Sequence, residues 1–235
     1  LNAGDFVTIV GSNGAGKSTL FNAISGVFSV DEGTIRLDSK NITNMKEYKR
    51  AYDIGRLFQD TMKGTAPNMT IEENLALAYS RKAGKSFFAV NKQDREYFTE
   101  LLKQLDLGLE SRMKAKVGQL SGGQRQAVSL LMSTISQPKL LLLDEHTAAL
   151  DPATARKVLD ITTRIVSEGR ITTMMITHDM QAALTLGNRT IMMDDGKIIF
   201  DISGEERAKM TVEDLLECYH ENSRKKLTND RMLLK

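Results

Sequence analysis

Short apolar runs bounded by turn residues alternate with longer amphipathic stretches along this chain of 235 residues. Such runs predict buried strands, whereas apolar positions that recur about every 3.6 residues predict helices. The apolar runs cover residues 6–10, 34–37, 140–143, 171–177, 191–193 and 197–200. The turn sequence Asp194-Asp195-Gly196 separates the last two runs and predicts a tight hairpin.

The amphipathic stretches carry residues that commonly mark helix boundaries. Residues 17–24 are expected to form a helix that ends near Gly26. Asp151-Pro152 combines a capping side chain with proline at the first helical position, and we expect that helix to end at Gly169. One apolar helix face, expected to pack into the core, is made by Tyr97, Phe98, Leu101, Leu102 and Leu105.

Strands that alternate with helices predict an α/β fold with a mostly parallel sheet. We assign residues 1–58 and 138–204 to this core. Helical signals dominate residues 59–137, which we interpret as an inserted helical subdomain. Residues 205–235 should form a short C-terminal helix and a basic tail, which is either solvated or in contact with anionic lipid or a membrane partner.

Composition limits the classes of partner. The 32 Lys and Arg residues nearly balance the 30 Asp and Glu residues, so the net charge of +2 gives no sign of a nucleic-acid partner. The single cysteine, Cys218, excludes an internal disulfide and a multi-cysteine zinc site. The aliphatic run at 140–143 is far shorter than the ~20 residues that span a bilayer, so any action at a membrane requires a partner.

A glycine-rich loop follows the first strand and reads Gly11-Ser12-Asn13-Gly14-Ala15-Gly16-Lys17-Ser18-Thr19. This sequence matches the phosphate-loop pattern, whose backbone N–H groups and helix N-terminus bind phosphate oxygens. Lys17 would neutralise the β- and γ-phosphates of ATP, and the hydroxyl of Ser18 could bind Mg²⁺. A strand that carries such a loop is normally central in its sheet, so the start at Leu1 leads us to expect further strands upstream.

Two carboxylates end the apolar run at 140–143. Asp144 would lie at the carboxyl edge of the sheet, where it could hold the magnesium ion. Glu145 follows directly and could polarise the attacking water, a role that typically contributes ~10²–10⁴-fold in rate. The pair therefore indicates hydrolysis of the nucleotide as well as binding.

A third sequence, Leu120-Ser121-Gly122-Gly123-Gln124, stands before a predicted helix that should end before Pro138. Together with the phosphate loop and the acidic pair, it resembles the signature of the ATP-binding cassette (ABC) family. Further matches in order are Gln59, the loop Ala149-Leu150-Asp151, and His178 in Ile176-Thr177-His178-Asp179. The resemblance runs from Val7 to about Asp201 and implies a P-loop NTPase (RecA-like) fold.

The family resemblance implies that two chains, as a homodimer or paired cassettes, bind ATP between them. The phosphate loop of one chain would face Ser121, Gly122 and Gly123 of the other, and the positive end of the signature helix would act on the γ-phosphate. Gln59 would sense the metal, and His178 would contact the γ-phosphate. His146 stands where most members have proline, so we interpret it as a structural loop residue.

Within the family, the chain resembles bacterial importers. It carries one cassette without a membrane span, and Lys114-Ala115-Lys116-Val117-Gly118-Gln119 lacks the acidic element common in exporters. Residues 69–75 resemble the surface that importers present to a coupling helix. These features imply integral membrane permease subunits, an extracytoplasmic substrate-binding protein, and a peripheral location at the cytoplasmic face of the cell membrane.

Two alternatives remain at this point. A soluble ABC ATPase that acts on chromosomes or ribosomes would need coiled-coil insertions or a second cassette, and neither is present in this sequence. A cassette that only senses ATP would be expected to lack Glu145, Ser121 or His178, all of which are present. The sequence therefore favours an ATP-hydrolysing transport subunit.

Overall fold

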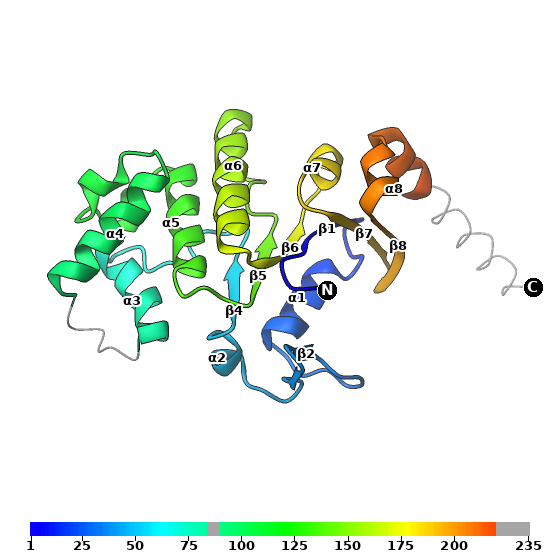
Figure 1. Cartoon of the computed structure of the whole chain (residues 1–235), viewed down its shortest axis with the longest axis horizontal. Coiled ribbons are helices and arrows are strands. Elements are labelled where there is room, and N and C mark those ends of the chain that lie inside the picture. The colour runs from blue at the N-terminus through cyan, green and yellow to red at the C-terminus, as the bar shows by residue number, and fades with distance from the viewer. Residues whose placement is uncertain (84–89, 220–235) are drawn as a thin grey trace, which may run out of the picture.

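The computed structural model describes residues 1–83 and 90–219 (Figure 1). A six-stranded sheet has the order β4-β5-β6-β1-β7-β8. Its strands are β1 Phe6–Gly11, β4 Ile54–Leu57, β5 Leu140–Asp144, β6 Thr172–Ile176, β7 Arg189–Asp194 and β8 Lys197–Ser203. Neighbouring strands run parallel except β7 and β8, which form the predicted antiparallel hairpin. The prediction of a largely parallel α/β sheet is confirmed.

The central strand β1 leads directly into the phosphate loop. Val7, Ile9 and Val10 are fully buried, as expected for a strand covered on both faces. It pairs with β6 on one side and β7 on the other, so the loop emerges in the middle of the sheet. This position is the topological switch point where ligands bind in such folds.

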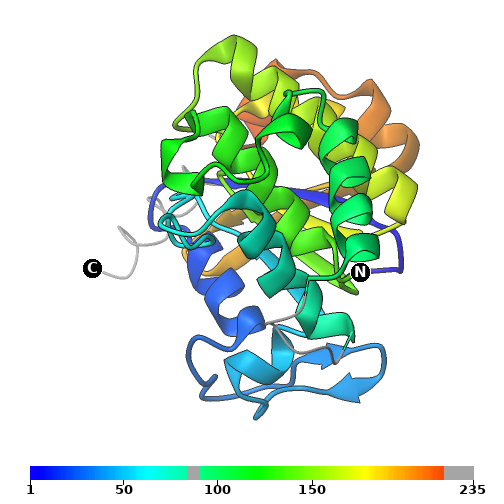
Figure 2. The same cartoon turned by 90° about the vertical axis from the view of Figure 1, so that its left-hand side faces the viewer.

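Helices cover both faces of the sheet (Figures 1 and 2). They are α1 Lys17–Ser25, α2 Glu47–Arg50, α3 Ile71–Ala83, α4 Lys92–Gln104, α5 Gly122–Thr134, α6 Pro152–Gly169, α7 Met180–Thr185 and α8 Gly204–Lys209, with 3-10 turns at Leu109–Arg112 and Val117–Gln119. Residues 212–219 are also helical.

Alternate residues of the strands enter two separate cores. On one face, Leu141 and Leu143 pack with residues of α3, α4, α5 and α6. On the other face, Leu140 and Leu142 pack with Phe21 of α1. This period of two fixes which side chains the strands present to each helical layer.

Local differences from the sequence predictions have clear causes. The expected strand at 34–37 is the short β2 Arg36–Leu37, paired with β3 Lys40–Asn41 around two residues of positive φ. Helix α6 ends at Gly169 as predicted, but the left-handed conformation is adopted by the C-cap residue Arg170. On α4, Phe98 and Leu102 are buried as predicted, but Tyr97 is 40% exposed and its ring packs at an angle of 46° against that of Tyr79.

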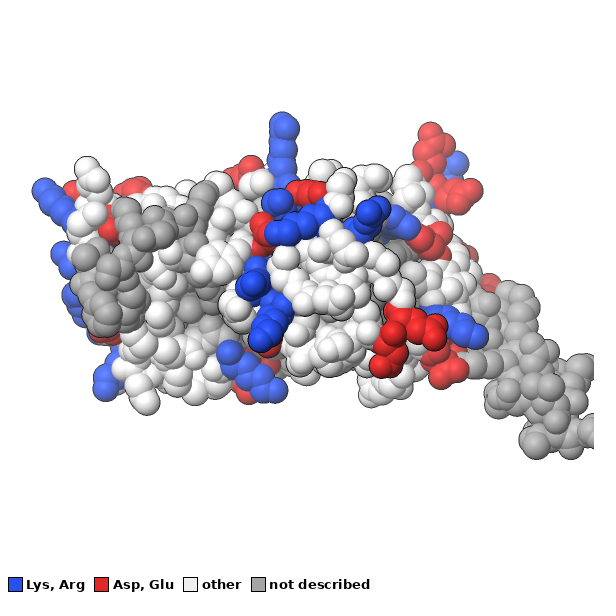
Figure 3. Space-filling view, turned by 90° about the horizontal axis from the view of Figure 1, so that it is seen from below, with Lys and Arg blue, Asp and Glu red and all other residues white. Residues whose placement is uncertain are grey.

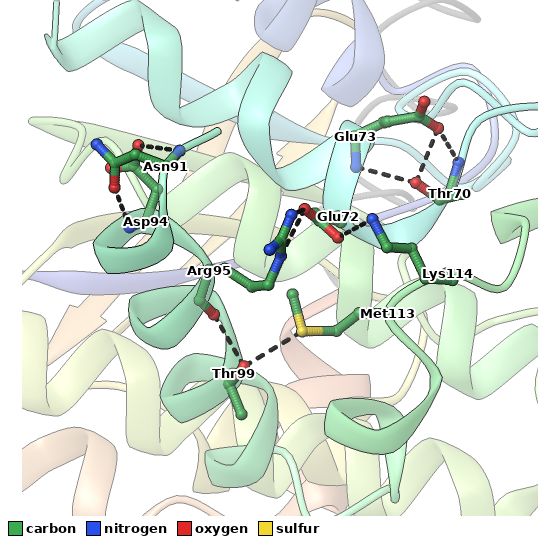
Figure 4. Close-up of polar contacts among 9 residues, drawn as sticks. All are labelled: Thr70, Glu72, Glu73, Asn91, Asp94, Arg95, Thr99, Met113 and Lys114. Carbon is green, nitrogen blue, oxygen red and sulfur yellow. Dashed lines mark hydrogen bonds and ion pairs between the residues drawn. The ribbon is translucent and has the colours of Figure 1, made fainter. Parts of the chain in front are cut away.

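Three ionic side chains join the helices of the 59–137 segment (Figure 4). The carboxylate of Glu72, 5% exposed, accepts hydrogen bonds from Nε and Nη2 of Arg95 at 3.0 and 2.9 Å and lies 2.6 Å from Nζ of Lys114. Burial alone would raise the pKa of Glu72, but Lys114 and Arg95 together lower it. Since a buried carboxylate is costly unless paired, these contacts keep α3 and α4 beside the chain at Lys114.

Surface charge is mixed on the face shown in Figure 3, where Lys and Arg side chains lie among Asp and Glu. Among the residues that the structure describes, no helix combines the length and apolar character needed to cross a bilayer. Arg224, Lys225 and Lys226, the basic residues of the predicted C-terminal tail, lie outside the described residues.

Candidate nucleotide-binding and hydrolysis site

Two glycines of the phosphate loop permit a backbone path that other residues would not. Gly11 has φ +150°, and a Cβ there would lie 2.2 Å from the carbonyl oxygen of Met193. Gly16 has φ +94°, and a Cβ there would lie 3.2 Å from Cα of Gly196. The loop therefore packs against the end of β7 and its turn in a conformation that favours glycine.

The side chain of Lys17 is hydrogen-bonded to the backbone of the phosphate loop. Its Nζ donates to the carbonyl oxygens of Gly11 at 2.8 Å and Ser12 at 2.9 Å, and the residue is only 6% exposed. Burial lowers the pKa of Lys17, whereas the charges of Glu145 and Asp144 raise it. No side chain caps the start of α1, whose first N–H groups therefore remain available to an anion.

The β7–β8 turn fastens this loop to the sheet. The hydroxyl of Ser12 donates to Oδ1 of Asp194 at 3.5 Å, and N–H of Gly196 donates to the carbonyl oxygen of Ala15 at 3.0 Å. The turn is predicted by its sequence, but this supporting role depends on contacts that the sequence does not specify. The remaining predicted loop residues, Asn13, Gly14, Ser18 and Thr19, are exposed.

Glu145 follows β5 in an unusual backbone conformation. Its φ is +45°, and its N–H donates to the carbonyl oxygen of Ile176 at 3.1 Å. A non-glycine residue in this region typically costs ~1–3 kcal/mol and persists only where surrounding structure imposes it. Here the adjacent strand β6 fixes the turn that directs the carboxylate.

Residues from three strand ends meet at Glu145. Nε2 of His178, just after β6, lies 2.7 Å from Oε1. Nε2 of Gln59, just after β4, donates to Oε2 at 3.2 Å. The Glu145 side chain is 16% exposed, whereas that of His178 is 46% exposed and Gln59 is also exposed, so the cluster faces solvent through these two residues. The structure thus brings together the three residues that sequence analysis assigned to hydrolysis.

Asp144 has a partner that sequence analysis missed. Nη2 of Arg56, on β4, lies 3.6 Å from Oδ2 of Asp144, and both side chains are largely buried. Burial raises the pKa of Asp144 and the charge of Glu145 adds to this, while Arg56 and Lys17 oppose it. Arg56 stands between Gly55 and Leu57 in a short strand, so no local sequence pattern identifies it as a partner of Asp144.

The signature caps its own helix. Oγ of Ser121 accepts from N–H of Gln124, and the Gln124 side chain accepts from N–H of Ser121, both at 3.3 Å. Ser121 and Gly122 are exposed, but Gly123 is buried, and a Cβ there would lie 2.2 Å from Cγ2 of Thr154. Within the described part of the chain, the hydrogen bonds and glycine contacts of the signature are with α5, Thr154 at the start of α6, Leu150 and Val117.

Asp151 is also used locally. Its Oδ1 accepts from N–H of Thr154 at 3.1 Å, which makes it the N-cap of α6 as predicted. Thr154 is the same residue that Gly123 contacts. Through this contact, the capped first turn of α6 helps to hold the signature in place.

The loop that follows Gln59 is joined to the loop that precedes the signature. N–H of Val117 donates to the carbonyl oxygen of Met69 at 3.0 Å, and N–H of Gly118 to that of Pro67 at 2.9 Å. Fully buried Asn74 donates to three carbonyl oxygens of the first loop. Residues 71, 72, 74 and 75 are buried and help to hold the two loops together, and the contact of 69–75 with a membrane partner stays a prediction.

His146 lies away from the carboxylate cluster. It is fully buried between β5 and α6, where its Nε2 lies 3.2 Å from Oγ1 of Thr162. Burial lowers the pKa of His146 to about 4. The Thr162 hydroxyl donates to the carbonyl oxygen of Val158, so the neutral imidazole serves as its donor. This environment agrees with a structural role.

Comparisons with known proteins support the family resemblance. The sequence model of the family described as ABC transporter matches residues 1–148. The tyrosine transport ATP-binding protein of Clostridioides difficile is 47% identical over 214 residues, which cover 91% of this chain and 85% of that protein. The methionine import ATP-binding protein MetN of Clostridium tetani is 34% identical over 203 residues, which cover 84% of this chain and 60% of that protein.

Solved structures show the same fold. The ADP-bound cassette MJ1267 of an ABC transporter matches with a TM-score of 0.76 at 30% identity, covering 93% of this chain and 89% of that one. The dimeric post-hydrolysis cassette MJ0796, bound to ADP and phosphate, matches with a TM-score of 0.74 at 29% identity, covering 86% and 87%. The chain therefore belongs to the ABC transporter family, as an ATP-binding subunit of the bacterial importer type that hydrolyses ATP to drive solute uptake.

Proposed function

We propose that this chain powers the uptake of an amino acid, tyrosine or a close chemical relative, through separate membrane permease subunits. The relative named for tyrosine transport is 47% identical, whereas relatives named for methionine, phosphonate or spermidine/putrescine import are 31–37% identical. The cassette itself contacts ATP and the permease rather than the cargo. The cargo is therefore proposed from similarity alone, and the chemistry from the site.

The convergence on Glu145 carries the proposed mechanism. In this proposal, Glu145 polarises the attacking water, and Gln59 and His178 hold its two carboxylate oxygens in position. The His178 side chain is 46% exposed and would also reach the γ-phosphate. Positioned groups of this kind contribute through orientation and general-base assistance.

The donors near the phosphate loop fit magnesium. Asp144, Ser18 and Gln59 offer oxygen ligands, which Mg²⁺ prefers, and usually only one or two protein carboxylates are needed beside phosphate oxygens. The described residues hold no cluster of three or more His, Cys, Asp or Glu side chains able to bind a metal unaided. This donor set therefore agrees with a magnesium site in which phosphate oxygens of the nucleotide supply the remaining ligands. When bound, the ion would neutralise charge on the β- and γ-phosphates.

We further propose that two copies of the chain, or paired cassettes, complete each site. Ser121 and Gly122 are exposed at the N-terminus of α5, where Ser121 caps its own helix and Gly122 lies beside Leu150. A helix N-terminus carries about half a positive charge, which favours a partner's γ-phosphate. The similar cassette MJ0796 is dimeric. Each ATP would then contact the phosphate loop of one chain and the signature of the other.

The assembly would include integral permease subunits and an extracytoplasmic substrate-binding protein, with this chain peripheral at the cytoplasmic face of the membrane. Co-expression with the permease, reconstitution into vesicles and uptake of labelled tyrosine test the proposal. We expect ATP-dependent uptake that unlabelled tyrosine competes out and methionine or spermidine does not. Matched vesicles with the Glu145→Gln variant should show none. Uptake unaffected by excess tyrosine would contradict the proposed cargo.

A further inference from the structure

Arg56 links elements that the phosphate loop, the acidic pair and Gln59 each depend on. Its Nη1 donates to Oγ of Ser25 at 3.0 Å, at the end of α1. Its Nη2 faces Asp144 at 3.6 Å, and its guanidinium lies 4.7 Å from the ring centre of Phe58, the residue before Gln59. The backbone beside Arg56 packs tightly on α5, because a Cβ at neighbouring Gly55 would lie 2.5 Å from the carbonyl oxygen of Ser133.

The ion pair between Arg56 and Asp144 is long and leaves a donor of Arg56 unused. A charge-assisted hydrogen bond is typically about 2.7–2.9 Å long, so the 3.6 Å separation is loose. In addition, Nε of Arg56 is buried and has no hydrogen-bond partner among the described residues. Because its ion pair is long and one of its donors is unused, the Arg56 guanidinium would lose little interaction energy on exchanging Asp144 for another partner.

A second location for this guanidinium lies next to the first. Arg56 lines a cavity of ≈ 220 Å³ between α2, β4 and α5, whose wall also includes Glu47 and Ser129. Ser129 is 3% exposed, and its Oγ finds no hydrogen-bond partner within the described part of the chain. The charge of Glu47 also acts on Arg56. The cavity thus offers a carboxylate and an unpaired hydroxyl to the spare donors of Arg56.

We propose that Arg56 is a positioning residue that neutralises Asp144 in the metal-free chain, competes with the divalent cation for this carboxylate, and turns toward Glu47 and Ser129 when the cation binds. The inference rests on the proposed role of Asp144 as a metal ligand. Without a compensating cation, two adjacent carboxylates at a largely buried strand end would destabilise the empty chain. Competition from Arg56 would therefore set the magnesium concentration at which the site fills.

The test measures cation affinity apart from turnover. Thermal unfolding of the full chain is followed with the non-hydrolysable analogue AMP-PNP over a range of free Mg²⁺ concentrations. We expect Arg56→Met to unfold at a lower temperature without nucleotide, yet to need roughly threefold to tenfold less Mg²⁺ for half-maximal stabilisation by AMP-PNP. Arg56→Lys, which keeps the charge, should need an amount close to that of the wild type.

Glu47→Gln supplies an opposite prediction at an exposed position that should not disturb folding. It removes the alternative partner of Arg56, so it should need more Mg²⁺ than the wild type. Arg36→Met, on β2, removes an exposed arginine elsewhere and should match the wild type. An unchanged or increased Mg²⁺ requirement in Arg56→Met, or an unchanged one in Glu47→Gln, would overturn the inference.

Asp144→Asn separates this inference from the proposed function on which it rests. We expect this variant to lose most of the Mg²⁺ dependence of AMP-PNP binding. If Asp144→Asn retained wild-type dependence, the metal-ligand assignment itself would fail. If it lost the dependence while Arg56→Met remained unchanged, only the competition by Arg56 would fail.

Discussion

His178 places its Nε2 atom 2.7 Å from Oε1 of Glu145, although the two residues follow different strands. Parallel pairing of β5 with β6 brings the two strand ends to the same edge of the sheet. The strained backbone of Glu145 then turns its carboxylate toward the imidazole. This contact supports the proposal that His178 positions Glu145.

We therefore expect His178→Ala to lower kcat for ATP hydrolysis by roughly 10²–10⁴-fold, because Glu145 loses one of its two orienting partners. Nucleotide affinity should change little, since the phosphate loop is untouched. His178→Gln, which can still donate to Glu145, should recover part of the rate. Phosphate release and binding of a fluorescent ATP analogue measure the two quantities. Full activity of His178→Ala would contradict the positioning role.

Lys17→Ala should weaken nucleotide binding itself. The change removes the cation expected to meet the β- and γ-phosphates, and also removes the two hydrogen bonds that Nζ makes to Gly11 and Ser12. Isothermal titration with ATP should show an affinity loss of at least about tenfold. Lys17→Arg keeps the charge and serves as the comparison. An unchanged titration for Lys17→Ala would exclude the assigned role.

Gly123→Ala tests the packing behind the signature. The new methyl group would lie 2.2 Å from Cγ2 of Thr154, and overpacking of this kind typically costs about 1–3 kcal/mol. Thr154→Ser removes Cγ2 and should restore most of the stability in the double variant. Urea unfolding of both single variants and the double variant measures this coupling. Equal destabilisation with and without Thr154→Ser would show that the contact is not the cause.

Buried His146 predicts a pH dependence of stability. Burial lowers its pKa from the ordinary 6.5 to about 4, so the unfolded chain binds more protons between these values. The contribution of neutral His146 to the free energy of unfolding is fully present above pH 6.5. It falls by roughly 3 kcal/mol as the pH drops to about 4. His146→Gln, which cannot titrate but can still donate to Thr162, should lose less stability over this range. Parallel pH curves for the two proteins would contradict the prediction.

Much of the architecture follows from local sequence. The run at 6–10 is wholly apolar and precedes a glycine-rich loop, which predicts a buried strand, a phosphate loop and a helix in turn. The capping pair Asp151-Pro152 likewise locates the start of α6. The hairpin of β7 and β8 follows from Asp194-Asp195-Gly196, where two residues take positive φ. In each case the signal lies within a few adjacent residues.

The missed features depend on contacts between distant segments. Arg56 meets Asp144 only because β4 pairs with β5. Similarly, Thr154 contacts Gly123 only after α5 and α6 pack together. Within the segment at 69–75, Asn74 and Glu72 satisfy their polar groups inside the fold. Their burial depends on partners that the local pattern does not specify.

The proposed paired site requires a state in which ATP joins two copies of the chain. Glu145→Gln should abolish turnover, because the carboxylate that polarises water is lost, while the phosphate loop still binds ATP. Gel filtration of this variant with Mg-ATP, over a range of protein concentrations, measures the outcome. We predict a dimer that retains nucleotide and returns to a monomer when ATP is replaced by ADP. A monomer at every concentration with ATP bound would contradict the account.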